Sequence, residues 1–183
     1  MPRQVHLFDR PSRFVAGTVG QPGDRTFYLQ ASDDSGRTVS VALEKTQVQV
    51  LADRMNELLD EVAGRANTEI PPVAEVDDLE PLAAPIDEEF RVAAMGLAWD
   101  GSAEAVVVEA VAAGEEPIDE EAILSDSDEG PDALRVTITP AAARAFVARA
   151  RRVVAAGRPP CPLCSLPLDP AGHVCPRQNG YRR

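Results

Sequence analysis

The sequence predicts an α+β protein in which two β-β-β-α units pack on a shared hydrophobic core. Three observations lead to this fold class: six short segments with alternating apolar residues, two amphipathic helical segments, and a numerical correspondence between the two halves of the chain. Alternation with a period of two indicates strands, whereas apolar residues three and four positions apart indicate a helix. One such unit is too small to cover its own sheet, so we expect the two to join in one sheet or to pack as two sheets.

The first unit covers residues 1–64. Strands are predicted at residues 13–20, 26–31 and 37–43, where Val39, Val41 and Leu43 share one face of the last strand. Turn residues rich in Gly, Asp and Pro separate these strands. A helix is predicted at residues 46–63, where apolar side chains recur at spacings of three and four.

The second unit covers residues 88–157, after a Pro-rich acidic linker at residues 65–87. Strands are predicted at residues 89–99, 104–112 and 133–139, and a helix from Pro140 to Ala156. Thr139 followed by Pro140 is a strong helix start, because threonine caps the first turn and proline is favoured directly inside it.

The two units correspond by position. An offset of 79 maps Gly17 onto Gly96, and an offset of 95 maps Leu43 onto Ile138. One insertion, the acidic loop at residues 114–132, accounts for the difference. We therefore predict an internal duplication, with chance likeness between two α+β segments as the alternative.

Charge is distributed unevenly along the chain. The net charge is −2 over residues 1–63, −18 over residues 64–132 and +8 over residues 133–183, which together give −12. Opposite signs could attract each other within the fold or present two surfaces to two partners, whereas the simpler interpretation is a solvated charged surface. The start of the sequence lacks a signal-peptide pattern, and no apolar run reaches the length of a membrane span. We expect a cytoplasmic protein with no membrane partner.

The C-terminal segment, residues 158–183, carries a metal-ligand pattern. Cys161 and Cys164 form a Cys-x-x-Cys turn, eight residues separate Cys164 from His173, and Cys175 follows two positions after His173. Three thiolates and one imidazole form a closed ligand set for one structural Zn²⁺. If His173 is not a direct ligand, then His6, Asp169 or water could complete the site. A redox-active dithiol or inert thiols are the alternatives to a metal site.

Three stretches of the sequence resemble an uncharacterised actinobacterial family of conserved hypothetical proteins. They are FDRPSRFVAGTVGQPGDRTFYLQA, VSVALEKTQVQVLADRMNELLDEV and the terminal CPLCSLPLDPAGHVCPRQNGYRR. Members are often encoded beside phosphatase-like and kinase-like proteins, so the resemblance implies a phosphorylation-related pathway. The metal turn departs from the usual zinc-knuckle sequence at one position. Ser165 follows the second cysteine, where zinc knuckles usually have glycine.

No catalytic motif stands out in the sequence. The phosphate-binding loop, the dinucleotide fingerprint and the nucleophile elbow are missing, and the only histidines are His6 and His173. We therefore predict a non-enzymatic zinc-binding adaptor with a protein partner. The residues predicted to bind that partner are Arg144, Arg149, Arg151, Arg152, Arg158, Arg177, Tyr181, Arg182 and Arg183.

Three other functions stay open. Duplicated sheet-and-helix units occur in single-strand nucleic-acid binders of the Whirly and Pur families, although the net charge of −12 opposes binding to phosphates. The basic surface from Arg158 to Arg183 could instead bind a phosphorylated ligand. An enzyme or a redox dithiol protein is the third alternative.

Overall fold

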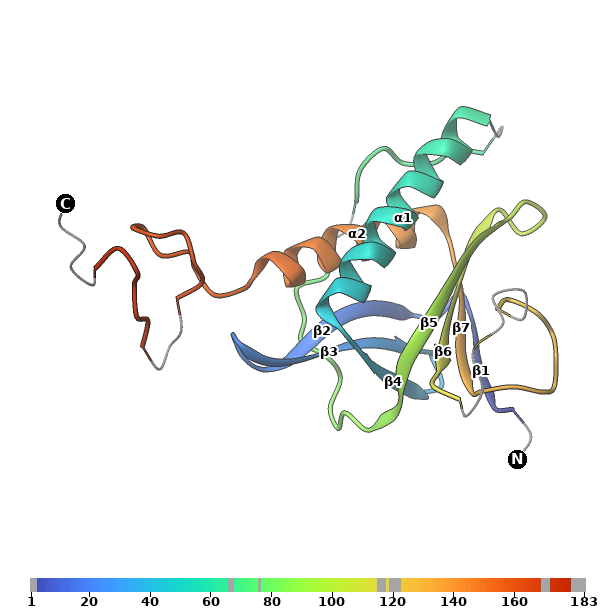
Figure 1. Ribbon diagram of the computed structural model, residues 1–183. Coiled ribbons are helices and arrows are strands. Elements are labelled where there is room, and N and C mark those ends of the chain that lie inside the picture. The colour runs from blue at the N-terminus through green and yellow to red at the C-terminus, as the bar shows by residue number, and fades with distance from the viewer. Residues whose placement is uncertain are drawn as a thin grey trace.

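A mixed seven-stranded sheet with two helices on one face forms the computed structural model (Figure 1). The structure describes residues 3–65, 68–75, 77–114, 118, 123–168 and 172–178. The elements are β1 (Val5–Asp9), β2 (Arg13–Gln21), β3 (Asp24–Ser32), β4 (Thr38–Leu43), α1 (Lys45–Arg65), β5 (Glu88–Asp100), β6 (Ala105–Ala112), β7 (Ala133–Ile138) and α2 (Pro140–Ala155).

The strand order β1-β7-β6-β5-β4-β3-β2 joins two antiparallel meanders. Strands β2, β3 and β4 form one meander and are followed by α1, and strands β5, β6 and β7 form the other and are followed by α2. The meanders meet through the parallel pair β4 and β5. The α+β class is confirmed, and the sheet is joined rather than split in two. The β-β-β-α order occurs twice, whereas its origin by duplication stays a prediction.

The first strand was missed by the sequence analysis. Strand β1 has only five residues and pairs in parallel with β7, with Val5 opposite Ala133. A five-residue segment is too short for its alternation to stand out, and its partner lies more than a hundred residues further along the chain. The N-terminal residues therefore complete the second half of the sheet.

The main hydrophobic core lies between the sheet and the two helices, which pack against each other (Figure 1). The rings of Phe14 on β2 and Phe146 on α2 stack at 4.8 Å between centroids. Helix α2 starts as predicted, since the Thr139 hydroxyl accepts a hydrogen bond of 3.2 Å from the Ala142 N–H and Pro140 is the first helical residue. Within the described residues, neither helix is both long and apolar enough to cross a membrane.

The linker between the two halves covers part of the opposite face of the sheet. Gln30 points to that face, because its neighbours on β3, Leu29 and Ala31, face the main core. The Gln30 side chain donates to the Ala83 carbonyl at 3.0 Å and accepts from the Ala83 N–H at 2.8 Å. A Cβ at Gly17 would lie 2.6 Å from Leu82, so the missing side chain makes room for the linker.

The second half of the opposite face is covered by the acidic loop. A Cβ at Gly96 would overlap Ile123, so this glycine also makes room for an apolar side chain from a connecting segment. Gly17 and Gly96 are the residues that the offset of 79 relates. Residues 115–117 and 119–122 of the predicted acidic loop lie outside the described residues.

A buried carboxylate ties the N-terminus and the acidic loop to the sheet. Glu109 on β6 is fully buried and accepts hydrogen bonds of 2.6 Å from both Arg3 and Arg135. Arg3 also donates to the Pro131 carbonyl, and Arg135 also donates to Asp126. Two guanidinium groups satisfy both oxygens of Glu109, which offsets the cost of burying its charge.

A second charge cluster fixes the linker at the edge of the sheet. Asp78 accepts hydrogen bonds from Arg13 on β2 at 2.6 Å and 2.9 Å, and from Arg149 on α2 at 3.0 Å. The hydrogen bonds from Arg13 hold the pKa of Asp78 below its ordinary value of 3.8, and the charges of Arg13 and Arg149 act in the same direction. The linker is therefore bound to the fold.

Replacing Glu109 with glutamine should destabilise the protein by about 3–5 kcal/mol, because the buried Arg3 side chain would lose its charged partner. Urea unfolding followed by circular dichroism measures the difference. The control is Glu88→Gln, since Glu88 is an exposed residue of β5. Equal stabilities for the two variants would contradict the role given to Glu109.

Asp78→Asn should lower the free energy of unfolding at neutral pH by about 1–3 kcal/mol, the range for hydrogen bonds to charged groups. The folded pKa of Asp78 is depressed, so its contribution is complete above the unfolded pKa and is lost as the pH falls through the folded value. The difference from the wild type should therefore shrink as the pH falls below about 4. The more exposed Asp77→Asn is the control, and a difference that did not change with pH would contradict the assignment.

Candidate metal centre

The metal-ligand segment continues beyond the end of α2 and folds as a tight hairpin (Figure 1). The Cys161 N–H donates to the Leu166 carbonyl at 2.7 Å, and the Leu168 N–H donates to the Pro159 carbonyl at 2.8 Å. An isolated antiparallel bridge joins Pro160 and Pro167. The Cys-x-x-Cys turn therefore lies at the tip of the hairpin.

The turn closes through a residue with left-handed backbone geometry. Ser165 has a φ of 60°, and its N–H donates to the Cys161 carbonyl at 2.8 Å. Glycine adopts this conformation without strain, whereas a residue with a Cβ is disfavoured there by about 1–2 kcal/mol. Ser165 thus takes the conformation for which zinc knuckles use glycine, and the departure noted in the sequence does not prevent the turn.

The structure brings all four predicted ligands together. One ligand atom from each of Cys161, Cys164, His173 and Cys175 lies within 4.8 Å of the others. The Cys161 and Cys175 sulfurs are 3.9 Å apart, and the Cys164 sulfur is 3.2 Å from His173 Nε2. Two sulfurs bound at about 2.3 Å to one tetrahedral ion would be about 3.8 Å apart. The cluster therefore has the dimensions of a metal-binding site.

Backbone groups favour the thiolate form of one ligand. The N–H groups of Cys164 and Leu163 lower the pKa of the Cys161 thiol to about 6. Loss of hydration raises the pKa of the Cys164 thiol. Cys161 and Cys175 are buried, whereas Cys164 and His173 are partly exposed. A thiolate at Cys161 near neutral pH suits metal coordination, because the thiolate is the form that binds metal.

The structure places the candidates for the fourth ligand differently. His173 belongs to the cluster, whereas His6 lies on β1 with its Nε2 atom 3.4 Å from a Glu89 carboxylate oxygen. His6 thus lies at the sheet, apart from the four clustered ligands. Asp169 lies outside the described residues.

A family comparison covers the fold and the metal ligands together. A family model described as "Protein of unknown function (DUF3090)" matches residues 6–175. The chain belongs to this family. The matched range runs from β1 to Cys175, so the region assigned to the family includes both halves of the sheet and all four clustered ligands. No curated protein and no solved structure matched the chain in the corresponding searches.

Two of the arginines predicted to bind a partner are buried inside the fold. Arg144 and Arg149 on α2 are each 5% exposed. Arg144 donates to Asp60 on α1 at 2.6 Å and to the Pro71 carbonyl at 2.8 Å. Arg149 donates to the Ala16 carbonyl at 2.8 Å as well as to Asp78. A partner could not reach these guanidinium groups without opening the fold.

The remaining predicted partner residues are at the surface or outside the description. Arg151 pairs with Asp53, and Arg152 pairs with Asp77, but both arginines are partly exposed. Arg177 is exposed after the last cysteine, and Arg158 is half-buried beyond the end of α2. A role for these four arginines in binding a partner stays a prediction. Tyr181, Arg182 and Arg183 lie outside the described residues.

The structure adds one feature that the sequence analysis missed. Leu163, Leu166 and Val174 in the metal-ligand segment are 48%, 50% and 79% exposed, respectively. Each lies within two residues of a cysteine or histidine ligand. Apolar residues placed between metal ligands are the pattern in the sequence that could have predicted this exposed surface. The ligand cluster therefore carries apolar side chains on its outside.

Proposed function

We propose that this chain is a non-enzymatic zinc-binding adaptor, in which one structural Zn²⁺ folds a C-terminal interaction surface. The observation that carries the proposal is the closed group of three cysteines and one histidine, with all four ligand atoms within 4.8 Å of one another. Its setting would be the phosphorylation-related pathway that the family resemblance implies.

The ligand chemistry supports zinc. Thiolates favour soft or borderline ions, and a group of three thiolates and one imidazole is a common tetrahedral site for structural zinc. Four protein ligands leave no position for a reactive water, which is the feature of catalytic zinc sites. The third cysteine and the histidine also set this arrangement apart from a simple Cys-x-x-Cys dithiol.

The exposure of apolar side chains supports a role in binding. Soluble proteins rarely group large apolar side chains at the surface without an interaction. Leu163 and Leu166 project from the hairpin, Val174 lies between the last two ligands, and Arg177 lies three residues beyond Val174. The partner would therefore offer an apolar contact accompanied by acidic groups.

The zinc content of the purified, untagged protein should be close to one ion per chain by plasma mass spectrometry. The double variant Cys161→Ser, Cys164→Ser should lose the zinc because two of four ligands are removed. Leu163→Ala is the control, since it changes the same turn without removing a ligand. Metal-free protein with reactive thiols would contradict the zinc site and favour the redox dithiol.

The adaptor surface predicts a binding partner that depends on the exposed apolar residues. Immobilised zinc-loaded protein should retain one specific protein from its own cells, and Leu166→Asp with Val174→Asp should abolish that retention. The control pair is Val73→Asp and Leu79→Asp, which changes equally exposed apolar residues of the linker. Titration of the purified partner by calorimetry then measures the loss of affinity. Equal binding by both double variants would refute this surface.

A further inference from the structure

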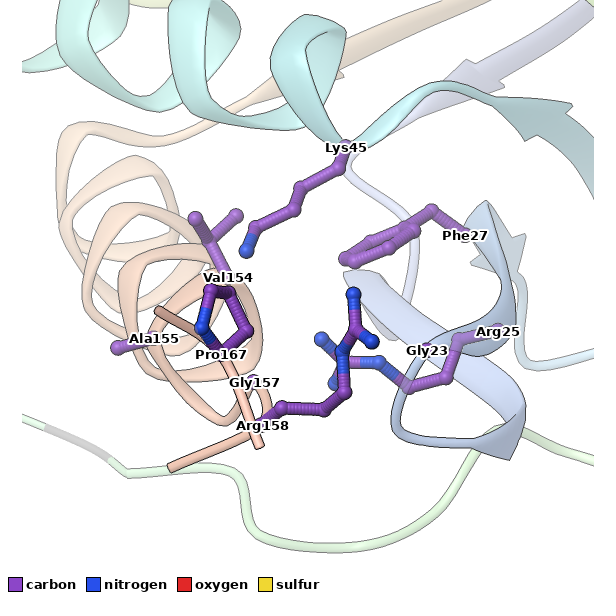
Figure 2. A pocket seen from close by; sticks show the side chains of 9 residues that line it. All are labelled: Gly23, Arg25, Phe27, Lys45, Val154, Ala155, Gly157, Arg158 and Pro167. Atoms are coloured by element: carbon purple, nitrogen blue, oxygen red, sulfur yellow. The ribbon is translucent and has the colours of Figure 1, made fainter. Parts of the chain in front are cut away.

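A basic pocket lies between the end of α2, the start of α1 and the β2–β3 hairpin. The cavity has a volume of about 420 Å³ and is lined by Arg25, Lys45, Arg158, Phe27, Val154 and Pro167, among others. Figure 2 shows that the cationic ends of Arg25, Lys45 and Arg158 point into the space between α2 and the hairpin. This volume is within the range of about 300–1,000 Å³ that small-molecule sites occupy.

The charge of this pocket is strongly positive. Among the described residues, three cationic side chains and no carboxylate line it. The carbonyl end of α2 also faces the pocket, and Arg25 donates to the Val153 carbonyl at 3.4 Å. A helix C-terminus carries only about half a negative charge, which is less than the full charge of Arg25 or of Lys45. The lining therefore favours an anionic ligand over a neutral or cationic one.

Local contacts position the cationic side chains that line the pocket. The Arg25 guanidinium lies over the Phe27 ring at 5.0 Å from its centroid, which fixes its direction. A Cβ at Gly157 would lie 3.6 Å from Lys45 Nζ, and a Cβ at Gly23 would lie 3.2 Å from Arg158 Cδ. Gly23 therefore leaves room for the Arg158 side chain, whereas a Cβ at Gly157 would only be in ordinary contact with Lys45.

Lys45 is the cation whose present position has the weakest structural reason. Within the part of the chain that the structure describes, it makes no hydrogen bond or ion pair, and it is exposed at the first residue of α1. A lysine with no partner normally extends into water, where its charge is best solvated. Here it extends over the end of α2 into the pocket that Arg25 and Arg158 also line.

We propose that this pocket binds the phosphate group of a small phosphorylated molecule. Lys45, Arg25 and Arg158 would contact the phosphate oxygens, since guanidinium and ammonium groups match phosphate in charge and in hydrogen-bonding geometry. The exposed Pro167 and the half-buried Val154 form an apolar wall for the organic part of the ligand.

The pocket depends on the metal centre through one wall. Pro167 belongs to the metal-ligand hairpin, where it bridges to Pro160 beside Cys161. The inference thus rests on the proposed zinc site only for this wall, whereas Arg25 and Lys45 belong to the sheet and α1. Loss of zinc should weaken binding of a phosphate ester more than binding of inorganic phosphate.

The test is calorimetric titration of the full zinc-loaded chain with inorganic phosphate and with phenyl phosphate at constant ionic strength. Wild-type protein should bind both saturably, and phenyl phosphate should bind more tightly because of the apolar wall. Lys45→Gln should weaken both by about tenfold, the effect of one lost charge-assisted hydrogen bond. Arg54→Gln is the matched control, since Arg54 is an exposed cation of the same helix that pairs only locally with Glu57.

The outcomes separate the pocket from the zinc site. Saturable binding that Lys45→Gln weakens and Arg54→Gln leaves intact supports the pocket. No saturable binding by protein that contains zinc overturns the pocket and leaves the zinc site standing. If both variants weaken phosphate binding equally, the binding is general charge attraction, and the pocket is likewise overturned. Equal affinity for the two probes overturns the assignment of an organic phosphate as the ligand.

Discussion

The main constraint on this architecture is that both faces of the sheet must be covered although the chain has only two helices. Both helices lie on one face, so the connecting segments must cover the other (Figure 1). The linker and the acidic loop do this with apolar side chains that fit against Gly17 and Gly96. Each segment is held by arginines, through Asp78 in the linker and through Asp126 beside Glu109 in the loop. The acidic middle of the chain and its basic final third therefore attract each other within the fold, which is one of the two outcomes that their charges allowed.

Sequence reasoning succeeded where the signal is local. Strand and helix periods are read over a few residues, and the four metal ligands stand within fifteen positions of one another. It failed where the environment of a residue depends on contacts with residues that are distant in the sequence. Arg144 and Arg151 are both arginines of the same helix, yet one is buried against Asp60 and the other is at the surface. Nothing within α2 alone distinguishes them, because the difference depends on where α1 and the linker lie.

Helix α2 connects the fold with both proposed sites. Its arginines hold α1 and the linker, its last turn forms a wall of the basic pocket, and the metal-ligand hairpin follows directly. A metal ion bound at the four ligands would therefore stiffen a segment that shares a wall with the pocket. Gly157 lies at this junction, within contact distance of the end of the Lys45 side chain. The three parts of the C-terminal region thus form one continuous unit.

The pairing of β1 with β7 has a consequence for biosynthesis. Val5 lies opposite Ala133, so the strand that leaves the ribosome early must wait for a partner that is made more than a hundred residues later. Contacts between such distant segments carry a large loop-closure cost and slow folding. The outer edge of β7 stays uncovered until β1 pairs with it. The first meander with α1 can assemble beforehand, so the last step in forming the sheet would be the return of the N-terminal residues.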